Sequence, residues 1–217
     1  MDTIFSVVSI LFYRRWFMEF DILKTAAEAY KKLMNIEYRI VLGRKGKEEQ
    51  LNIIFTPENF YHLAGFHKLK QRYSFQKKTS AWILEHILEE NISIRSIEQD
   101  QNWLKVVGRL RALCMLEKLM DAQDTKFYSY DMRKVTFATK IDADYLAQGR
   151  IENAPIVFSF FIKADSNYCM KSIFFKEAYD YSFRQTQYTV LLKEKITRNE
   201  KNIISRELYR HNKYHIK

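Results

Sequence analysis

One stretch decides the expected fold: Phe55-Thr56-Pro57-Glu58-Asn59-Phe60-Tyr61-His62-Leu63-Ala64-Gly65-Phe66-His67-Lys68-Leu69-Lys70. It is typical of a strand end, a turn, and a helix that carries two histidines and a lysine. Thr56 can cap this helix, and Pro57 suits the first helical position, where its missing N–H costs nothing. The helix is predicted to continue to about Tyr73.

The two histidines are expected on different sides of this helix. At about 100° per residue, Phe60, Leu63, Ala64 and His67 fall on one face, whereas His62 lies roughly 160° away from Phe60. His67 is therefore predicted to be a packed, structural residue. His62 is predicted to be either solvated or turned towards a site.

The composition predicts a folded chain with a sizeable core. Of 217 residues, 47% are apolar and 15% aromatic, so disorder is not expected as the overall state, and residues 1–217 are interpreted as one domain. Five glycines and two prolines argue against a loop-rich β-sandwich. Cys114 and Cys169 are too few for a disulfide framework and lack zinc-ligand spacing, which fits a reducing cytoplasm.

The charge points to polyanions as partners. A net charge of +10 favours nucleic acid before anionic lipid, although a basic surface can also serve solubility alone. Residues 198–217 are interpreted as a basic C-terminal tail with interleaved aromatics, which suits stacking on exposed bases. Residues 1–17 are interpreted as an N-terminal extension: the apolar run 4–13 is too short to span a bilayer, so no stable membrane insertion is expected.

Helical periodicity precedes strand-like patterns along the chain. Helices are predicted over 19–35, from 79 or 80 to about 88, and over 98–121. Strands are predicted over 37–42, 50–55, 127–130, 135–139, 156–162, 173–175 and 188–192. Residues 43–47 are predicted to form a hairpin tip, and residues 147–149 a turn. The fold class is α+β, with N-terminal helices packed on a C-terminal antiparallel β-sheet.

Several chemistries have no supporting motif. The sequence contains no Gly-rich phosphate loop, no His-Glu-x-x-His and no Gly-x-Ser-x-Gly. Asp142 and Asp144 share a face if they lie on a strand, where they could hold Mg²⁺, but a solvated turn is the favoured interpretation. No metal or cofactor is expected.

Three polar sets remain as candidates for chemistry. They are the helix set (His62, His67, Lys68), the strand set (Lys171-Ser172) and the set at 185–193, in which Thr189 and Lys193 are expected on one strand face. An imidazole, a cation and hydroxyl or amide donors suffice for metal-free RNA cleavage: a base takes the 2′-OH proton, cations stabilise the phosphate charge, and an acid protonates the leaving oxygen. A strand lysine or threonine can equally be a solvated surface residue.

Residues 59–69 resemble a known signature, Asn-Phe-x-His-Leu-x-Gly-x-x-Lys-Leu, of a phage-associated group of predicted nucleases with the barnase–EndoU–colicin–RelE-like fold. His62 and Lys68 occupy its specified positions, and His67 an unspecified one. Residues 143–146, 171–175 and 188–195 are similar to later elements of that group, and the likeness covers about 19–197. The resemblance implies helices on a four-stranded antiparallel sheet, a metal-independent RNase site on the exposed sheet face, and an antitoxin or immunity protein as partner. A minimal nuclease of this fold would not need the helical stretch at about 79–121, which is therefore interpreted as a helical insertion that could bind substrate or a partner.

The resulting prediction is a cytoplasmic, metal-independent endoribonuclease of toxin or phage-defence type. His62 is assigned as general acid/base, and Lys68 and Lys171 as phosphate-stabilising cations. Ser172, Thr189 and Lys193 are secondary candidates. The alternatives are a non-catalytic nucleic-acid-binding or regulatory protein and a protein-interaction module held at a membrane through residues 4–16.

Overall fold

The computed structural model describes residues 21–199 and 202–215 of the chain, and the expected extension 1–17 lies outside them. The helices it describes are α2 (Ile22–Leu33), α3 (Phe60–Ala64), α4 (Ser80–Leu88), α5 (Trp103–Cys114) and α6 (Leu116–Asp121). The strands are β1 (Ile36–Arg44), β2 (Lys47–Ile54), β3 (Lys126–Ser129), β4 (Tyr145–Gly149), β5 (Val157–Ala164), β6 (Asn167–Phe175), β7 (Thr186–Arg198) and β8 (Ile203–Arg210). The α+β class is confirmed.

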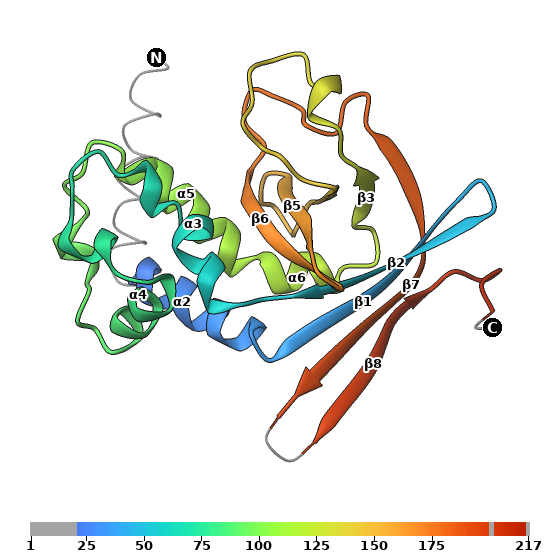
Figure 1. The fold of residues 1–217 in the computed structure, drawn as a ribbon, viewed down its shortest axis with the longest axis horizontal. Coiled ribbons are helices and arrows are strands. Elements are labelled where there is room, and N and C mark those ends of the chain that lie inside the picture. Colours follow the sequence, from blue (N-terminus) through green and yellow to red (C-terminus); the bar gives the residue numbers. More distant parts are fainter. Residues whose placement is uncertain (1–20, 200–201, 216–217) are drawn as a thin grey trace.

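Among the described residues, the strands form one sheet that closes on itself, with the helices gathered on one side of it (Figure 1). The order β1-β2-β6-β5-β4-β3-β7 is completed by pairing of β7 with β1, and β8 adds to β7 outside this ring. Closure is possible because β7 is 13 residues long, so one edge pairs with β1 while the other pairs with β3 and then β8. The expected antiparallel sheet of C-terminal strands is therefore wrong in two respects: the N-terminal strands β1 and β2 belong to the same closed sheet, and β2 pairs with β6 in parallel.

Three segments differ from the expected elements. Residues 147–149, expected as a turn, belong to β4, because antiparallel pairing with β3 and β5 outweighs the local turn signal of Gln148-Gly149. Residues 203–210, expected within a basic tail, form β8, whose side chains are mostly exposed and so lack the alternation that marks a half-buried strand. Residues 135–139, expected as a strand, form no strand in the structure.

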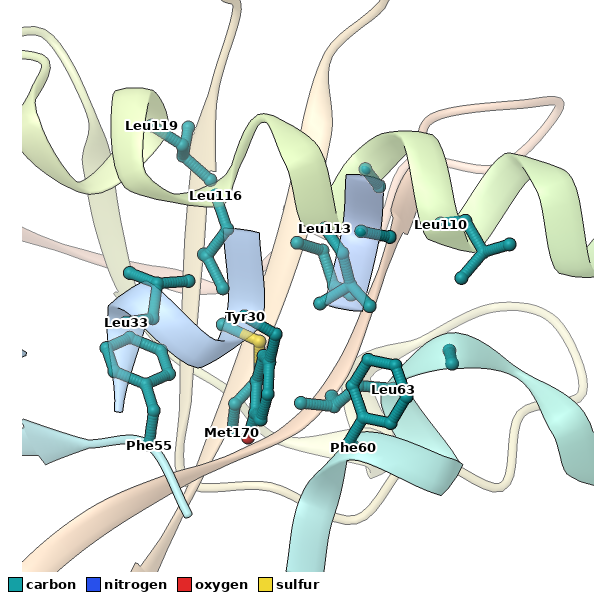
Figure 2. Close-up of a cluster of buried hydrophobic side chains, with 14 of the residues drawn as sticks. Tyr30, Leu33, Phe55, Phe60, Leu63, Leu110, Leu113, Leu116, Leu119 and Met170 are labelled. Atoms are coloured by element: carbon teal, nitrogen blue, oxygen red, sulfur yellow. The ribbon is translucent and has the colours of Figure 1, made fainter. Parts of the chain in front are cut away.

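The main core lies between the helices and the interior of the closed sheet. Leu110 and Leu113 of α5 and Leu116 and Leu119 of α6 are at most 1% exposed and lie above Tyr30 and the neighbouring core side chains (Figure 2). Each such leucine contributes about 1.5–3 kcal/mol by leaving water. The helical stretch at 79–121, interpreted as an insertion, is thus packed into the main core.

A smaller apolar cluster lies on the opposite face of β4 and β5. Successive side chains of β5 point to opposite faces of the sheet. Val157 and Phe161 therefore lie in the main core, and Phe158 and Phe160 lie in this second cluster. Side chains from the loops at 130–143 and 176–185 cover it.

A β-bulge in β7 reverses the direction of its side chains. Val41 of β1 pairs with Leu192 and Leu42 pairs with Val190, so Leu191 is an extra residue. Before the bulge, Tyr188 and Val190 pack against the main core; after it, Lys193 is fully buried. An inserted residue shifts the two-residue period by one, so the expectation that Thr189 and Lys193 share a face is wrong.

Among the helices that the structure describes, none combines the length and the apolar character needed to cross a bilayer.

Candidate active site at the His62–His67 pair

Gly65 ends the helix that carries His62. α3 stops at Ala64, Gly65 adopts φ +84°, and its N–H donates to the carbonyl of His62 at 3.1 Å. This left-handed residue is a common helix terminator, because glycine has no Cβ to collide with the following backbone. The 3₁₀ turn η2 (Phe66–Lys68) then runs in a new direction. The predicted continuous helix to Tyr73 is therefore wrong.

This reversal brings the two histidines together. Their rings stack with centroids 4.0 Å apart and an interplanar angle of 6°, contrary to the expectation that they lie on different sides. His62 is exposed and His67 is half-buried. Nδ1 of His67 is buried and has no hydrogen-bond partner within residues 21–199 and 202–215. Buried polar atoms are usually paired, so an unpaired one beside an exposed imidazole is unusual and is often found at functional sites.

Arg109 of α5 lies directly behind the pair. A Cβ placed on Gly65 would approach Cδ of Arg109 to 2.5 Å, so the glycine also permits this close contact. Nη1 of Arg109 donates to Oγ of Ser172 at 3.2 Å, and its guanidinium lies 5.6 Å from the ring centroid of Phe174. Ser172 itself is buried. Helix α5, the α3 segment and strand β6 therefore meet at one place.

The charged groups that act on the histidines are cations. Although His62 is exposed, partial burial of its ring lowers its pKa, and Arg109, Lys171 and Lys68 lower it further. Burial, His62, Arg109 and Lys68 lower the pKa of His67 to about 3. Both imidazoles are therefore neutral at pH 7.

The pKa of Lys68 is lowered as well. Burial is the main cause, followed by Arg109, Lys105 and Lys140. The cation cluster comprises Lys68, Lys105, Arg109, Lys140 and Lys171. A concentration of positive charge around two neutral bases suits an anion, and in the part of the chain that the structure describes no group of three or more His, Cys, Asp or Glu could hold a metal ion.

The structure thus brings together four of the predicted site residues, namely His62, Lys68, Lys171 and Ser172. It also adds His67, which was expected to be structural.

Lys193 lies elsewhere, inside the closed sheet. Its Nζ donates to the carbonyl of Ala122 at 2.6 Å and lies 5.8 Å from the ring centroid of Phe127, and burial lowers its pKa to about 8. Thr189 is exposed and faces a shallow hollow that Gln187 and Tyr209 also line. No interaction described for either residue involves the histidine pair. Asp144 accepts a hydrogen bond from the backbone N–H of Lys163 at 2.7 Å.

Sequence reasoning did not select Arg109, Lys105 or Lys140. One signal for Arg109 was present: it lies three residues after Val106 and four before Leu113, both of which are buried. Arg109 therefore shares the apolar face of α5, and a cation in such a row needs an anion or another polar partner.

A family model of nucleases matches residues 22–209, which is most of the chain. No curated protein and no solved structure matches this chain with significant similarity. The match spans the histidine pair, α5 and β6, which are the elements that build the site. The chain therefore belongs to the phage-Barnase-EndoU-ColicinE5/D-RelE like nuclease 4 family, PBECR4.

Proposed function

We propose that this nuclease is a metal-independent endoribonuclease whose site is the His62–His67 pair and the surrounding cation cluster. The observation that supports this most directly is the set of charges around His62. Within residues 21–199 and 202–215, the charged groups that shift its pKa are Arg109, Lys171 and Lys68, and all three are positive. Such a site attracts phosphate and repels a metal ion, so the nucleophile is best supplied by the substrate itself.

His62 is the general base in this proposal. It is exposed and neutral at pH 7, so it can take the proton of a ribose 2′-OH. The 2′-oxygen then attacks phosphorus and the bond to the 5′-oxygen breaks. The products are a 2′,3′-cyclic phosphate and a 5′-hydroxyl end.

In this proposal Lys68, assigned from the sequence as a phosphate-stabilising cation, instead donates the proton that the departing 5′-oxygen requires. Its lowered pKa makes its ammonium a better acid than an ordinary lysine. Arg109 and Lys171 stabilise the charge that develops on the phosphate oxygens. Ser172 acts through Arg109, because its hydroxyl accepts the hydrogen bond that orients the guanidinium.

The test is cleavage of a single-stranded RNA in the presence of EDTA. We expect wild-type protein to cleave, and His62→Ala to lose about 10²–10⁴-fold in rate, which is the usual contribution of general acid/base catalysis. His215→Ala, at an exposed histidine of the C-terminal segment, is the matched control and should cleave normally. Loss of wild-type activity on chelation, or full activity of His62→Ala, would refute the proposal. Binding without turnover and with a steep salt dependence would favour a non-catalytic nucleic-acid-binding protein instead.

We further propose that the enzyme acts in the cytoplasm as a toxin or phage-defence nuclease restrained by an antitoxin or immunity protein. The phage association in the description of its family supports this role. Induced expression of the wild-type chain should arrest bacterial growth, whereas His62→Ala at equal protein level should not. Equal growth of both strains would count against a toxin.

A further inference from the structure

An aromatic surface adjoins the cation cluster. Arg109 lies over Phe174, whose ring centroid is 5.2 Å from that of Tyr181. Tyr181 contacts Phe137 edge-on at 4.8 Å, and Phe137 stacks on Tyr179 at 4.3 Å with an interplanar angle of 21°. An unbroken series of ring contacts therefore leads from the guanidinium of Arg109 to Tyr179.

The far end of this series is exposed. Tyr179 is 57% exposed although Phe137 stacks against it. Phe137 and Tyr181 are half-buried and hold Tyr179 from below, because Tyr181 packs on Phe158 and Phe160 of the second apolar cluster. A stacked, supported aromatic ring that leaves so much of its area in water is poorly explained by the needs of the core.

The loop at 130–143, which carries Phe137, also supplies positive charge to the site. Lys140, which follows Phe137 by three residues, acts on the pKa of Lys68 beside the histidine pair. The loop that carries Phe137 therefore also contributes a cation to the cluster.

We propose that Phe137, Tyr179 and Tyr181, here called the aromatic platform, stack the unpaired nucleobases of a single-stranded RNA whose phosphate lies at the His62–His67 pair. This rests on the proposed function and adds to it the class of substrate. Cations that follow the backbone, combined with aromatic rings for the bases, are the usual means of binding single strands. The bases of a duplex offer no free face to such a ring, so the platform selects unpaired RNA.

A protein partner is the less suitable occupant. An apolar peptide would gain from Tyr179, but it would gain nothing from the adjoining cluster of five cations. An RNA strand would contact both the cation cluster and the aromatic platform, with its phosphates on the cations and its bases on the rings.

The test measures binding rather than cleavage. The probes are two labelled oligomers of equal length: a 2′-O-methyl oligoadenylate, which lacks the attacking hydroxyl, and an abasic oligomer with the same phosphates. Fluorescence anisotropy gives the Kd of each for wild type, Tyr179→Ala and Tyr179→Phe. The control is Ile204→Ala on β8, where the side chain is also 57% exposed.

Stacking on one ring changes affinity by about tenfold. We therefore expect Tyr179→Ala to bind the oligoadenylate about tenfold more weakly and the abasic oligomer as wild type does. Tyr179→Phe and Ile204→Ala should bind both probes normally. Unchanged binding of the oligoadenylate by Tyr179→Ala, or an equal loss for both probes, would overturn the platform.

Failure of the platform and failure of the proposed function give different results. If wild type binds the oligoadenylate through Tyr179 but never cleaves RNA, the platform stands and the catalytic proposal fails. If RNA is cleaved through His62 while Tyr179→Ala binds normally, the catalytic proposal stands and the platform fails.

Discussion

Replacing Gly65 by alanine should damage the proposed active site as well as the fold. Gly65 has φ +84°, a conformation that costs an L-residue about 1–2 kcal/mol. Its new Cβ would also lie 2.5 Å from Cδ of Arg109, so the arginine must move. Displacement breaks the hydrogen bond to Ser172, worth about 0.5–1.5 kcal/mol, which brings the expected loss to roughly 1.5–3.5 kcal/mol.

Gly46 offers a matched control for the backbone part of this effect. It has φ +76° at the tip of the β1–β2 hairpin, and a Cβ placed there meets nothing within 4 Å. Gly46→Ala should therefore lose only about 1–2 kcal/mol. RNA cleavage should be unchanged in Gly46→Ala and should fall by about 10²–10³-fold in Gly65→Ala, as is typical when one preorganised charge-stabilising donor is lost.

Urea denaturation supplies the stabilities, since a shift of the midpoint at constant slope reports a change in free energy of unfolding. A double-mutant cycle with Arg109→Ala isolates the collision. In the Arg109→Ala background, Gly65→Ala should cost no more than Gly46→Ala does. Equal losses of stability and activity for Gly65→Ala and Gly46→Ala in the wild-type background would refute the close contact between Gly65 and Arg109.

Two further predictions concern titration. For wild-type protein, the acid limb of kcat/KM for RNA should have its midpoint below pH 6.5, because His62 must be neutral to act as base and its pKa is lowered by burial and by cations. Lys171→Gln removes one of these cations and should move the midpoint to higher pH. Lys171→Arg keeps the charge and should leave the midpoint in place. An unchanged midpoint in Lys171→Gln would show that Lys171 does not act on His62. Lys193 has a pKa of about 8 when folded and about 10.4 when unfolded, so between these values the unfolded chain binds more protons and the protein gains stability as pH rises. Lys193→Met should lack this gain in stability, which urea midpoints measured from pH 8 to 10.4 would show, and it should still cleave RNA. The same pH dependence of stability in wild type and Lys193→Met would contradict the buried position of Lys193.

Local signals in the sequence predicted what depends on local geometry. The hairpin at 43–47 is confirmed: Arg44 pairs with Lys47, and Lys45 and Gly46 both have positive φ, as tight two-residue hairpins require. Thr79 caps α4 by accepting a hydrogen bond from the N–H of Trp82. In each case a few neighbouring residues determine the outcome.

At Gly65 the local sequence is compatible with two different backbone conformations. A glycine within a helical pattern can continue the helix at a cost of about 1 kcal/mol or terminate it in the left-handed conformation. Helical spacing favoured the first, which separated His62 from His67. The structure has the second, and contacts distant in sequence, such as that with Arg109, favour it.

The closed sheet depends on contacts that no local pattern reports. The bulge at Leu191 interrupts a run that fits simple alternation, so the burial of Lys193 could not be read from spacing. Ring closure depends on the parallel pairing of β2 with β6, which joins residues more than a hundred positions apart. The position of Arg109 beside the site depends on how α5 packs against β6.

The parallel pairing of β2 with β6 has a consequence for when the candidate site is assembled. It consists of two paired positions, Ile53 with Tyr168 and Ile54 with Cys169, and it joins the strand leading to His62 to the strand that carries Lys171. The ribosome therefore synthesises His62 and His67 more than a hundred residues before Lys171, one of the cations that lower the pKa of His62. The candidate site is therefore incomplete in the growing chain until β6 has been made and has paired with β2.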